Sequence, residues 1–100
     1  MSASVTLPRP GEAIQDQIDS IDRVARPYIV ILYNDDHHPA DQVVSQLQKA
    51  TGNDIETCVA TMLDAHLNGR SIAFKGSEDE AERVAGVLRQ IRLQVETDRA

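Results

Sequence analysis

The sequence has few cysteine and aromatic residues and no long apolar run. Of its 100 residues only Cys58 is a cysteine, aromatic residues make up 3%, and tryptophan is absent. A single cysteine excludes an internal disulfide and any zinc site built on paired thiolates, so Cys58 is most simply a small core residue. The longest apolar runs are far too short to cross a bilayer, and the start of the chain lacks the basic and then apolar pattern of an export signal. We therefore expect a cytoplasmic protein that does not bind membranes.

Positive charge is also scarce. Ten lysine and arginine residues against sixteen acidic residues give a formal net charge of -6. Nucleic-acid surfaces depend on clustered basic residues, which are scattered here, so the partners are expected to be proteins or peptides. No glycine-rich phosphate loop, GxSxG elbow or HExxH motif occurs, and a chain of this length has little room for an enclosed active site. We predict that the protein is not an enzyme and needs no cofactor.

The composition fits one small globular domain preceded by an extension. Apolar residues make up 41% and charged residues 26% of the chain, which is ordinary for a globular protein. Residues 1–26 contain two early prolines and few apolar residues, so they predict a mobile N-terminal extension. A short helix from about Ala13 to Val24 is compatible with the spacing of its isoleucines, although it would be marginal alone. Residues 27–100 form the predicted domain.

The first half of this domain predicts a strand followed by two helices. The run YIVILY from Tyr28 to Tyr33 is short, apolar on both faces and rich in β-branched residues, which favours a central strand. Pro39 suits the first position of a helix over about 40–50. Asn53 is the predicted N-cap of the next helix, which ends at Gly69. The apolar face of that helix would comprise Ile55, Val59, Met62, Leu63 and His66.

The second half adds a strand, a helix and a final strand. Ile72 and Phe74 alternate with polar or small residues and predict a strand with one buried face. Ser77 begins a capping-box pattern before a third helix with an apolar stripe. A final edge strand would contain Leu93 and Val95. The order β-α-α-β-α-β predicts an α+β fold, a small single-domain sandwich in which helices cover one face of a three-stranded antiparallel sheet.

Five polar and mostly ionisable side chains follow the first strand, from Asn34 to His38. The simplest interpretation is a turn in which asparagine and aspartate side chains satisfy their own backbone and cap the coming helix. A second interpretation is metal binding, and the competent ligands would be Asp35, Asp36, His37, His38 and His66. Neighbouring side chains in an extended segment point apart, however, and the spacing typical of a metal signature is absent. We therefore predict no metal site, and a metal-dependent enzyme is the least favoured function.

A third interpretation is a receptor for a positively charged group. Asn34 and Asp35 offer an amide oxygen and a carboxylate at the end of a strand, and this segment contains no lysine or arginine. His66 falls in the same helical stripe as Met62 and next to Ala65, so an apolar pocket would border it. Hydrogen-bond acceptors beside a hydrophobic pocket would suit an ammonium group attached to an apolar side chain.

Three segments, VILYNDDHHP, LQK and MLDAHLNGRSI, occur in an order and separation that resemble the ClpS family, the adaptor of the ATP-dependent Clp protease. The resemblance spans Tyr28 to about Ala85. It implies an adaptor that binds the free α-amino group and the bulky hydrophobic side chain of an N-terminal residue, the N-degron of the N-end rule. It also implies delivery of the bound substrate to the N-terminal domain of a Clp-family AAA+ unfoldase.

Carried over position by position, the resemblance assigns roles to individual residues. The amino group would be bound by Asn34, Asp35, Asp36 and His66. The hydrophobic pocket would be lined by Ala40, Val43, Met62 and Ala65, with His38 at its rim. The unfoldase would contact the start of the third helix at Glu78 and Arg83.

Three positions depart from the family pattern. His38 stands where threonine is usual, Ala40 where methionine forms a gate over the pocket, and Ala65 where valine is common. The two smaller walls should widen the pocket, so we expect N-terminal isoleucine or the largest aromatic residues to be tolerated. Imidazoles ordinarily titrate near pH 6.5, and protonated His38 and His66 would repel an ammonium group, so binding should weaken as the pH falls through about that value. The alternative is a ClpS-like domain that has lost N-degron recognition and docks on or regulates a Clp unfoldase.

Overall fold

The computed structural model describes residues 26–100, which form a three-stranded sheet and three helices. The elements follow the chain in the order β1 (Tyr28–Tyr33), α2 (Ala40–Thr51), α3 (Ile55–Asn68), β2 (Arg70–Gly76), α4 (Glu78–Arg89) and β3 (Val95–Arg99). This is the predicted order of strands and helices. The expected mobile extension, up to residue 25, and the possible helix from Ala13 to Val24 lie outside the described residues.

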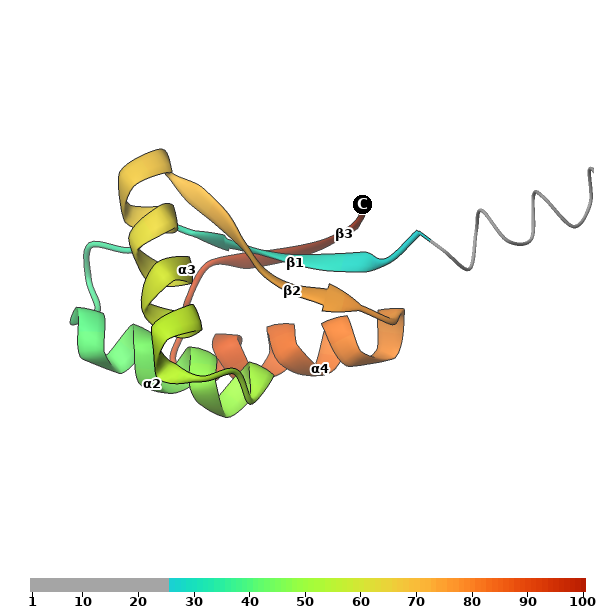
Figure 1. Ribbon diagram of the computed structural model, residues 1–100, viewed down its shortest axis with the longest axis horizontal. Helices are drawn as coiled ribbons and strands as arrows, with labels where there is room; N and C mark the ends of the chain where they lie inside the picture. Colours follow the sequence, from blue (N-terminus) through green and yellow to red (C-terminus); the bar gives the residue numbers. More distant parts are fainter. Residues whose placement is uncertain (1–25) are drawn as a thin grey trace, which may run out of the picture.

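The sheet has the order β2-β1-β3, and both outer strands are antiparallel to the central one. In Figure 1, α2 and α4 run along one side of the sheet, and α3 leads from the end of α2 to the start of β2. The predicted α+β sandwich, with its helices on one face of an antiparallel sheet, is confirmed.

The strand β1 lies at the centre of the sheet because both of its faces are apolar. Val30 and Leu32 are 0% and 1% exposed on the face toward the helices. Ile29 and Ile31 are half-buried on the other face. A strand with two apolar faces loses most contact with water when strands flank it on both sides, so the predicted central position is confirmed.

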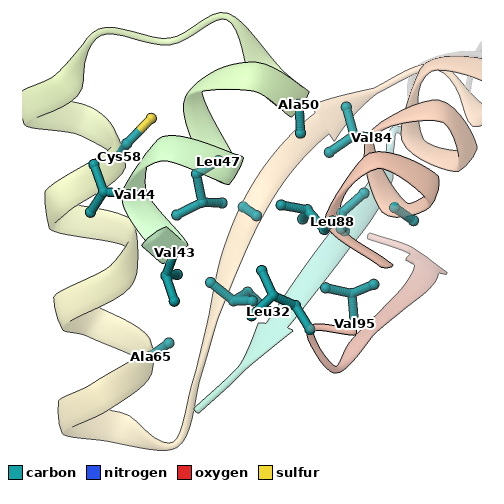
Figure 2. Close-up of a cluster of buried hydrophobic side chains, with 14 of the residues drawn as sticks. Leu32, Val43, Val44, Leu47, Ala50, Cys58, Ala65, Val84, Leu88 and Val95 are labelled. Carbon is teal, nitrogen blue, oxygen red and sulfur yellow. The ribbon is translucent and has the colours of Figure 1, made fainter. Parts of the chain in front are cut away.

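The hydrophobic core fills the space between the sheet and the helices (Figure 2). Leu47 of α2 and Leu88 of α4 are 1% and 0% exposed, and fully burying one leucine side chain stabilises a fold by roughly 1.5–3 kcal/mol. Cys58 is 2% exposed as a free thiol, which confirms it as a small core residue. Val43 and Ala65 belong to the same cluster, so the core continues to the start of α2 and the end of α3.

The alternation in β2 is interrupted, and the predicted buried face is wrong for Ile72. Ile72 is 50% exposed, whereas Ser71 and Ala73 are 6% and 5% exposed. The reason is a shift in the register with β1, a β-bulge in which Ala73 is the extra residue. Phe74, on the far side of the bulge, packs partly against the core as predicted. One added residue thus places Ile72 on the outer face of the sheet.

The helix α3 buries only part of the predicted apolar stripe. Cys58 and Ala65 are its fully buried residues, and Val59 and Met62 of the stripe pack partly against the core as predicted. The prediction is wrong for Ile55 and Leu63, which are 53% and 45% exposed, and for His66, which is exposed as well. The helix lies close to β2, since the Ser71 hydroxyl of the strand donates a hydrogen bond of 2.8 Å to a backbone carbonyl of the helix.

The N-caps of α3 and α4 are both made by side chains. The Asp54 carboxylate accepts a hydrogen bond of 2.9 Å from the backbone N–H of Thr57. The predicted cap at Asn53 is therefore wrong by one residue, because asparagine and aspartate cap equally well and residue type does not choose between them. The cap of α4 is the predicted Ser77, whose hydroxyl accepts from the backbone N–H of Glu80.

Two further boundaries differ from the sequence prediction. Pro39 occupies the N-cap position before α2 rather than its first helical position, and among the described residues no side chain caps that helix. Leu93 precedes β3 instead of lying within it, because the chain turns sharply at Arg92, whose φ of 65° is left-handed. Leu93 is nevertheless 3% exposed, so the turn places its side chain in the core.

Candidate functional site

Two backbone hydrogen bonds at the end of β1 bring distant parts of the chain to the polar segment that follows it. The N–H of Asn34 donates to the carbonyl of Gly69 over 2.9 Å, which holds the end of α3 beside this segment. The N–H of Tyr33 donates to the carbonyl of Gln94 over 3.0 Å, which holds the turn before β3 at the same place. The last turn of α3, which carries His66, therefore lies near the end of β1.

The segment Asn34–His38, here called the polar turn, is organised around the carboxylate of Asp35. Its Oδ1 accepts hydrogen bonds from the backbone N–H groups of His37 at 2.6 Å and of His38 at 3.1 Å. Its Oδ2 lies 2.7 Å from Nδ1 of His38, and the two side chains are only 10% and 19% exposed. The predicted turn, in which an aspartate satisfies its own backbone, is confirmed. The predicted cap of the coming helix by one of these side chains is wrong, since Pro39 is the N-cap residue of α2 and no described side chain caps that helix.

The hydrogen bonds of the polar turn also favour the charged form of Asp35. Burial alone would raise its pKa. Hydrogen bonds from the backbone of His37 and from the ring and backbone of His38 outweigh burial, so the pKa lies below its ordinary value. Asp35 therefore holds a negative charge throughout the physiological pH range, which suits a cationic ligand.

Asn34 is oriented by its neighbour in the polar turn. Its Nδ2 donates to Oδ1 of Asp36 at 3.4 Å. This contact uses the amide nitrogen, so the amide oxygen is the atom that can accept a hydrogen bond from a ligand. Asp36 therefore orients the Asn34 amide and adds a second negative charge to the turn.

A pocket of about 260 Å³ opens between the polar turn, α2 and α3. Every residue predicted for the amine site, the hydrophobic pocket and its rim lines this pocket, namely Asn34, Asp35, Asp36, His38, Ala40, Val43, Met62, Ala65 and His66. His37 does not line it, although its backbone supports Asp35. The structure thus brings the predicted residues together, and their roles in binding stay predictions.

Three residues that the sequence prediction did not assign also line the pocket, Leu32, Tyr33 and Leu93. Leu32 could have been found from its place on the inner face of β1, one residue before its end. Leu93 is apolar among polar neighbours, but its position depends on the turn at Arg92, which the sequence pattern does not indicate. Val95, the other apolar residue of the predicted last strand, borders a neighbouring cavity instead.

The pocket has an acidic side and an apolar side. Among the described residues that line it, Asp35 and Asp36 are carboxylates and none is lysine or arginine. The last turn of α3, which carries His66, also lies here, and the C-terminal end of a helix bears a partial negative charge that favours cations. On the apolar side, Val43 and Ala65 are 6% and 3% exposed. The arrangement can hold a positive charge next to an apolar group.

Residues 26–100 contain no group of three or more His, Cys, Asp or Glu side chains placed to hold a metal ion. The metal-binding interpretation therefore finds no site in the described part of the chain. Nor does any helix within those residues have the length and apolar character needed to cross a membrane.

The two residues predicted to contact an unfoldase lie on α4. Glu78 is the first residue of that helix and is exposed. Arg83 donates a hydrogen bond of 3.1 Å to the backbone carbonyl of Ala50, in the last turn of α2. A positive charge at the C-terminal end of a helix is stabilising, so Arg83 links α4 to α2 in addition to any contact with a partner.

Comparison with known families identifies this fold and site. Residues 23–96 match the family described as ATP-dependent Clp protease adaptor protein ClpS. The chain belongs to the ClpS family. The resemblance first indicated by the polar turn and the end of α3 is therefore confirmed, and the matched range runs from before β1 to the first two residues of β3.

Two curated ClpS proteins show how far the similarity extends. The chloroplastic ATP-dependent Clp protease adapter CLPS1 of Arabidopsis thaliana is 31% identical over 80% of this chain and 51% of its own length. The ClpS adapter of Albidiferax ferrireducens is 37% identical over 54% of this chain and 45% of its own length. The chain thus spans about half the length of the curated relatives it matches.

A solved ClpS structure has the same fold. Agrobacterium tumefaciens ClpS2 bound to L-phenylalaninamide superimposes with a TM-score of 0.69 and 25% sequence identity. The match covers 75% of this chain and 98% of the Agrobacterium chain. The similarity therefore extends over nearly the whole Agrobacterium chain.

Proposed function

We propose that this ClpS-family chain is an adaptor that binds N-terminal residues of substrate proteins and delivers those substrates to a Clp unfoldase. The observation that carries the proposal is one pocket lined by the acceptors of the polar turn, by His66 and by aliphatic side chains. The ligand of Agrobacterium ClpS2 supports it, because L-phenylalaninamide combines a free α-amino group with an apolar side chain.

The acidic side of the pocket binds the α-ammonium group of the substrate. The ammonium donates to the amide oxygen of Asn34, to the Asp35 carboxylate and to a ring nitrogen of neutral His66, while Asp36 adds negative charge. A hydrogen bond to a charged group contributes about 1.5–3 kcal/mol. Acetylation removes both the charge and donors, so acetylated termini bind poorly.

The apolar side of the pocket binds the first side chain of the substrate. Burying a large apolar side chain contributes roughly 1.5–3 kcal/mol, and Ala40, Val43, Met62 and Ala65 supply the walls. A micromolar complex needs about 8 kcal/mol, which neither contact reaches alone. The site therefore recognises a free amine and a bulky hydrophobic residue jointly, and it rejects a charged first residue because an unpaired charge is costly to bury.

Delivery to the protease requires a second surface. We assign it to the start of α4, where Glu78 is exposed and Arg83 contributes its remaining donors, and the partner is the N-terminal domain of a Clp-family AAA+ unfoldase. In this role the chain is an adaptor and not an enzyme, and it acts without a cofactor. We expect it in the cytoplasm, whereas its Arabidopsis relative is chloroplastic.

The most direct test is a fluorescence titration of the full chain with a labelled peptide that begins with a free leucine or phenylalanine. The same peptide with an acetylated N-terminus is the control. We expect the free peptide to bind at least about tenfold more tightly, which corresponds to one lost charge-assisted hydrogen bond. Equal affinity for the two peptides would contradict N-degron recognition.

One observation favours a second candidate function. Asp35 is already bonded to His38 at 2.7 Å, so an ammonium group must share that carboxylate with an imidazole. A chain that cannot release this contact would be a ClpS-like domain that only docks on or regulates an unfoldase. This alternative holds if neither peptide binds while the chain still changes the rate at which a purified Clp protease degrades a tagged test substrate.

A further inference from the structure

A second apolar hollow lies between α2 and α3, beside the pocket described above. Its volume is about 470 Å³. The hollow, here called the interhelix groove, is lined by Ala40, Asp41, Val44, Ser45, Gln48, Ile55, Val59 and Met62. Ile55 is 53% exposed at its edge. Ile55, Val59 and Met62 of the predicted apolar stripe of α3 therefore form one wall of the groove.

The interhelix groove and the pocket share a wall. Ala40 at the start of α2 and Met62 in the middle of α3 line both hollows. Ala40 is exposed and carries only a methyl group, and Met62 is half-buried. The apolar surface therefore continues from the pocket over these two residues into the groove, and a ligand seated in the pocket has the groove directly beside it.

An extended peptide would present alternate side chains to these two hollows. Successive side chains of an extended chain point to opposite sides, and each residue advances the chain by about 3.3 Å. The first and third side chains of a substrate therefore share one side and are about 6.6 Å apart. For a peptide that runs from the pocket toward the groove, the third side chain would face the groove while the first lies in the pocket and the second faces solvent.

We propose that the interhelix groove is a subsite for an apolar side chain at the third residue of the substrate, an inference that rests on the proposed N-terminal recognition. The groove adjoins the pocket, with which it shares Ala40 and Met62, and it has the apolar lining that such a side chain needs. Another cavity that shares residues with the pocket includes Arg89, Gln94 and Glu96 in its lining and is a poorer match. Its one charged lining residue is Asp41, which repels an acidic side chain. The chain thus selects substrates with two apolar residues, first and third.

The test is a competition titration of the full chain with peptides that all begin with a free leucine. One set varies the third residue among leucine, glycine and aspartate with serine at the second position. The other set places leucine at the second position and serine at the third. We expect third-position leucine to bind about tenfold more tightly than glycine, aspartate to bind most weakly, and second-position leucine to change affinity less than twofold.

Two variants of the groove locate the effect. Ile55→Glu places a charge at the edge of the groove, and Ser45→Gln adds bulk at an exposed position of α2. Each should remove the preference for third-position leucine and leave the ratio between free and acetylated peptides unchanged. Leu67→Glu is the matched control, because Leu67 is 76% exposed on the same helix and lines neither hollow.

The possible failures are distinct. If free and acetylated peptides bind equally, the proposed function fails and the groove loses its substrate. If the free amine is recognised but the third residue has no effect, or if Leu67→Glu reduces the leucine preference as much as Ile55→Glu does, the groove is not a subsite and the pocket acts alone.

Discussion

The two sides of the candidate site are built in different ways. The polar turn is made by five consecutive residues, Asn34–His38, and its side-chain hydrogen bonds join residues two or three positions apart. The apolar side takes Leu32 from β1, Val43 from α2, Met62 and Ala65 from α3, and Leu93 from the turn before β3. The acidic side is therefore mostly local and is joined only by His66 from α3, whereas the apolar side is assembled from segments far apart in the chain.

This difference indicates which changes each side tolerates. The side-chain hydrogen bonds of the polar turn join residues close in the chain, so we expect its charge and shape to depend less on the rest of the fold. The apolar side exists only while the helices pack against the sheet, because its side chains belong to the core or border it. Changes to the core should therefore alter the pocket before they alter the turn.

The largest effect is expected from Leu93→Ala. Leu93 is 3% exposed and lines the pocket, and replacing a buried leucine by alanine lowers the free energy of unfolding by about 2–5 kcal/mol. Urea unfolding of the variant and the parent chain measures this loss. Leu67→Ala is the control, since Leu67 is 76% exposed and should change stability by less than about 0.5 kcal/mol. Equal losses in the two variants would contradict the tertiary origin of the apolar side.

Asp35→Ala should break the polar turn with a smaller effect on the fold. It removes the acceptor of three hydrogen bonds within the turn and the carboxylate proposed to bind the amine. Affinity for a peptide with a free N-terminal leucine should fall by at least about tenfold, and the difference from the acetylated peptide should vanish. Asp98→Ala, an exposed position on β3 with the same charge change, should leave affinity unchanged. A retained preference for the free amine would contradict the role of Asp35.

Ala40→Met tests the apolar side of the site, because it adds a bulky side chain to one wall of the pocket. Ala40 is exposed at the start of α2 and lines the pocket, so a longer side chain there can cover the opening. In the parent chain we expect peptides beginning with isoleucine and leucine to differ by less than tenfold. In the variant the isoleucine peptide should lose about tenfold relative to leucine, because a β-branched side chain has little freedom at χ1 to avoid the added group. A parent chain that already prefers leucine by more than tenfold would show that the pocket is not widened.

The smallest effect is expected when the pH is lowered and the stability of the folded chain is measured. The pKa of Asp35 is lowered in the folded chain, since hydrogen bonds from His37 and His38 outweigh burial. Its contribution to stability is therefore fully present above about pH 4, the usual range of an unfolded aspartate, and is lost as the pH falls through the lower folded value. The difference in melting temperature between the parent chain and Asp35→Asn should be constant from pH 7 to pH 5 and shrink below pH 4. A difference that persists unchanged at pH 2.5 would assign the effect to packing.

The sequence predicted the element order, and which residues line one pocket, better than it predicted the faces of single elements. YIVILY specified a central strand because an apolar pattern on both faces is compatible with little else at that length. The face of β2 was wrong for Ile72 because one bulge at Ala73 shifts the alternation. The apolar stripe of α3 was right for Val59 and Met62, which pack partly against the core, and wrong for Ile55 and Leu63, which are exposed.

The sequence by itself indicated the ClpS family, the β-α-α-β-α-β order and the polar turn, since each can be recognised from patterns within short segments and from the order of those segments along the chain. Only the tertiary structure decided that Leu32 and Leu93 complete the pocket and that Arg83 bonds to the end of α2. It also decided that Ala40 and Met62 separate the pocket from a second apolar groove. The physical reason is that a hollow is a property of how elements pack, and packing depends on side chains that the sequence places far apart.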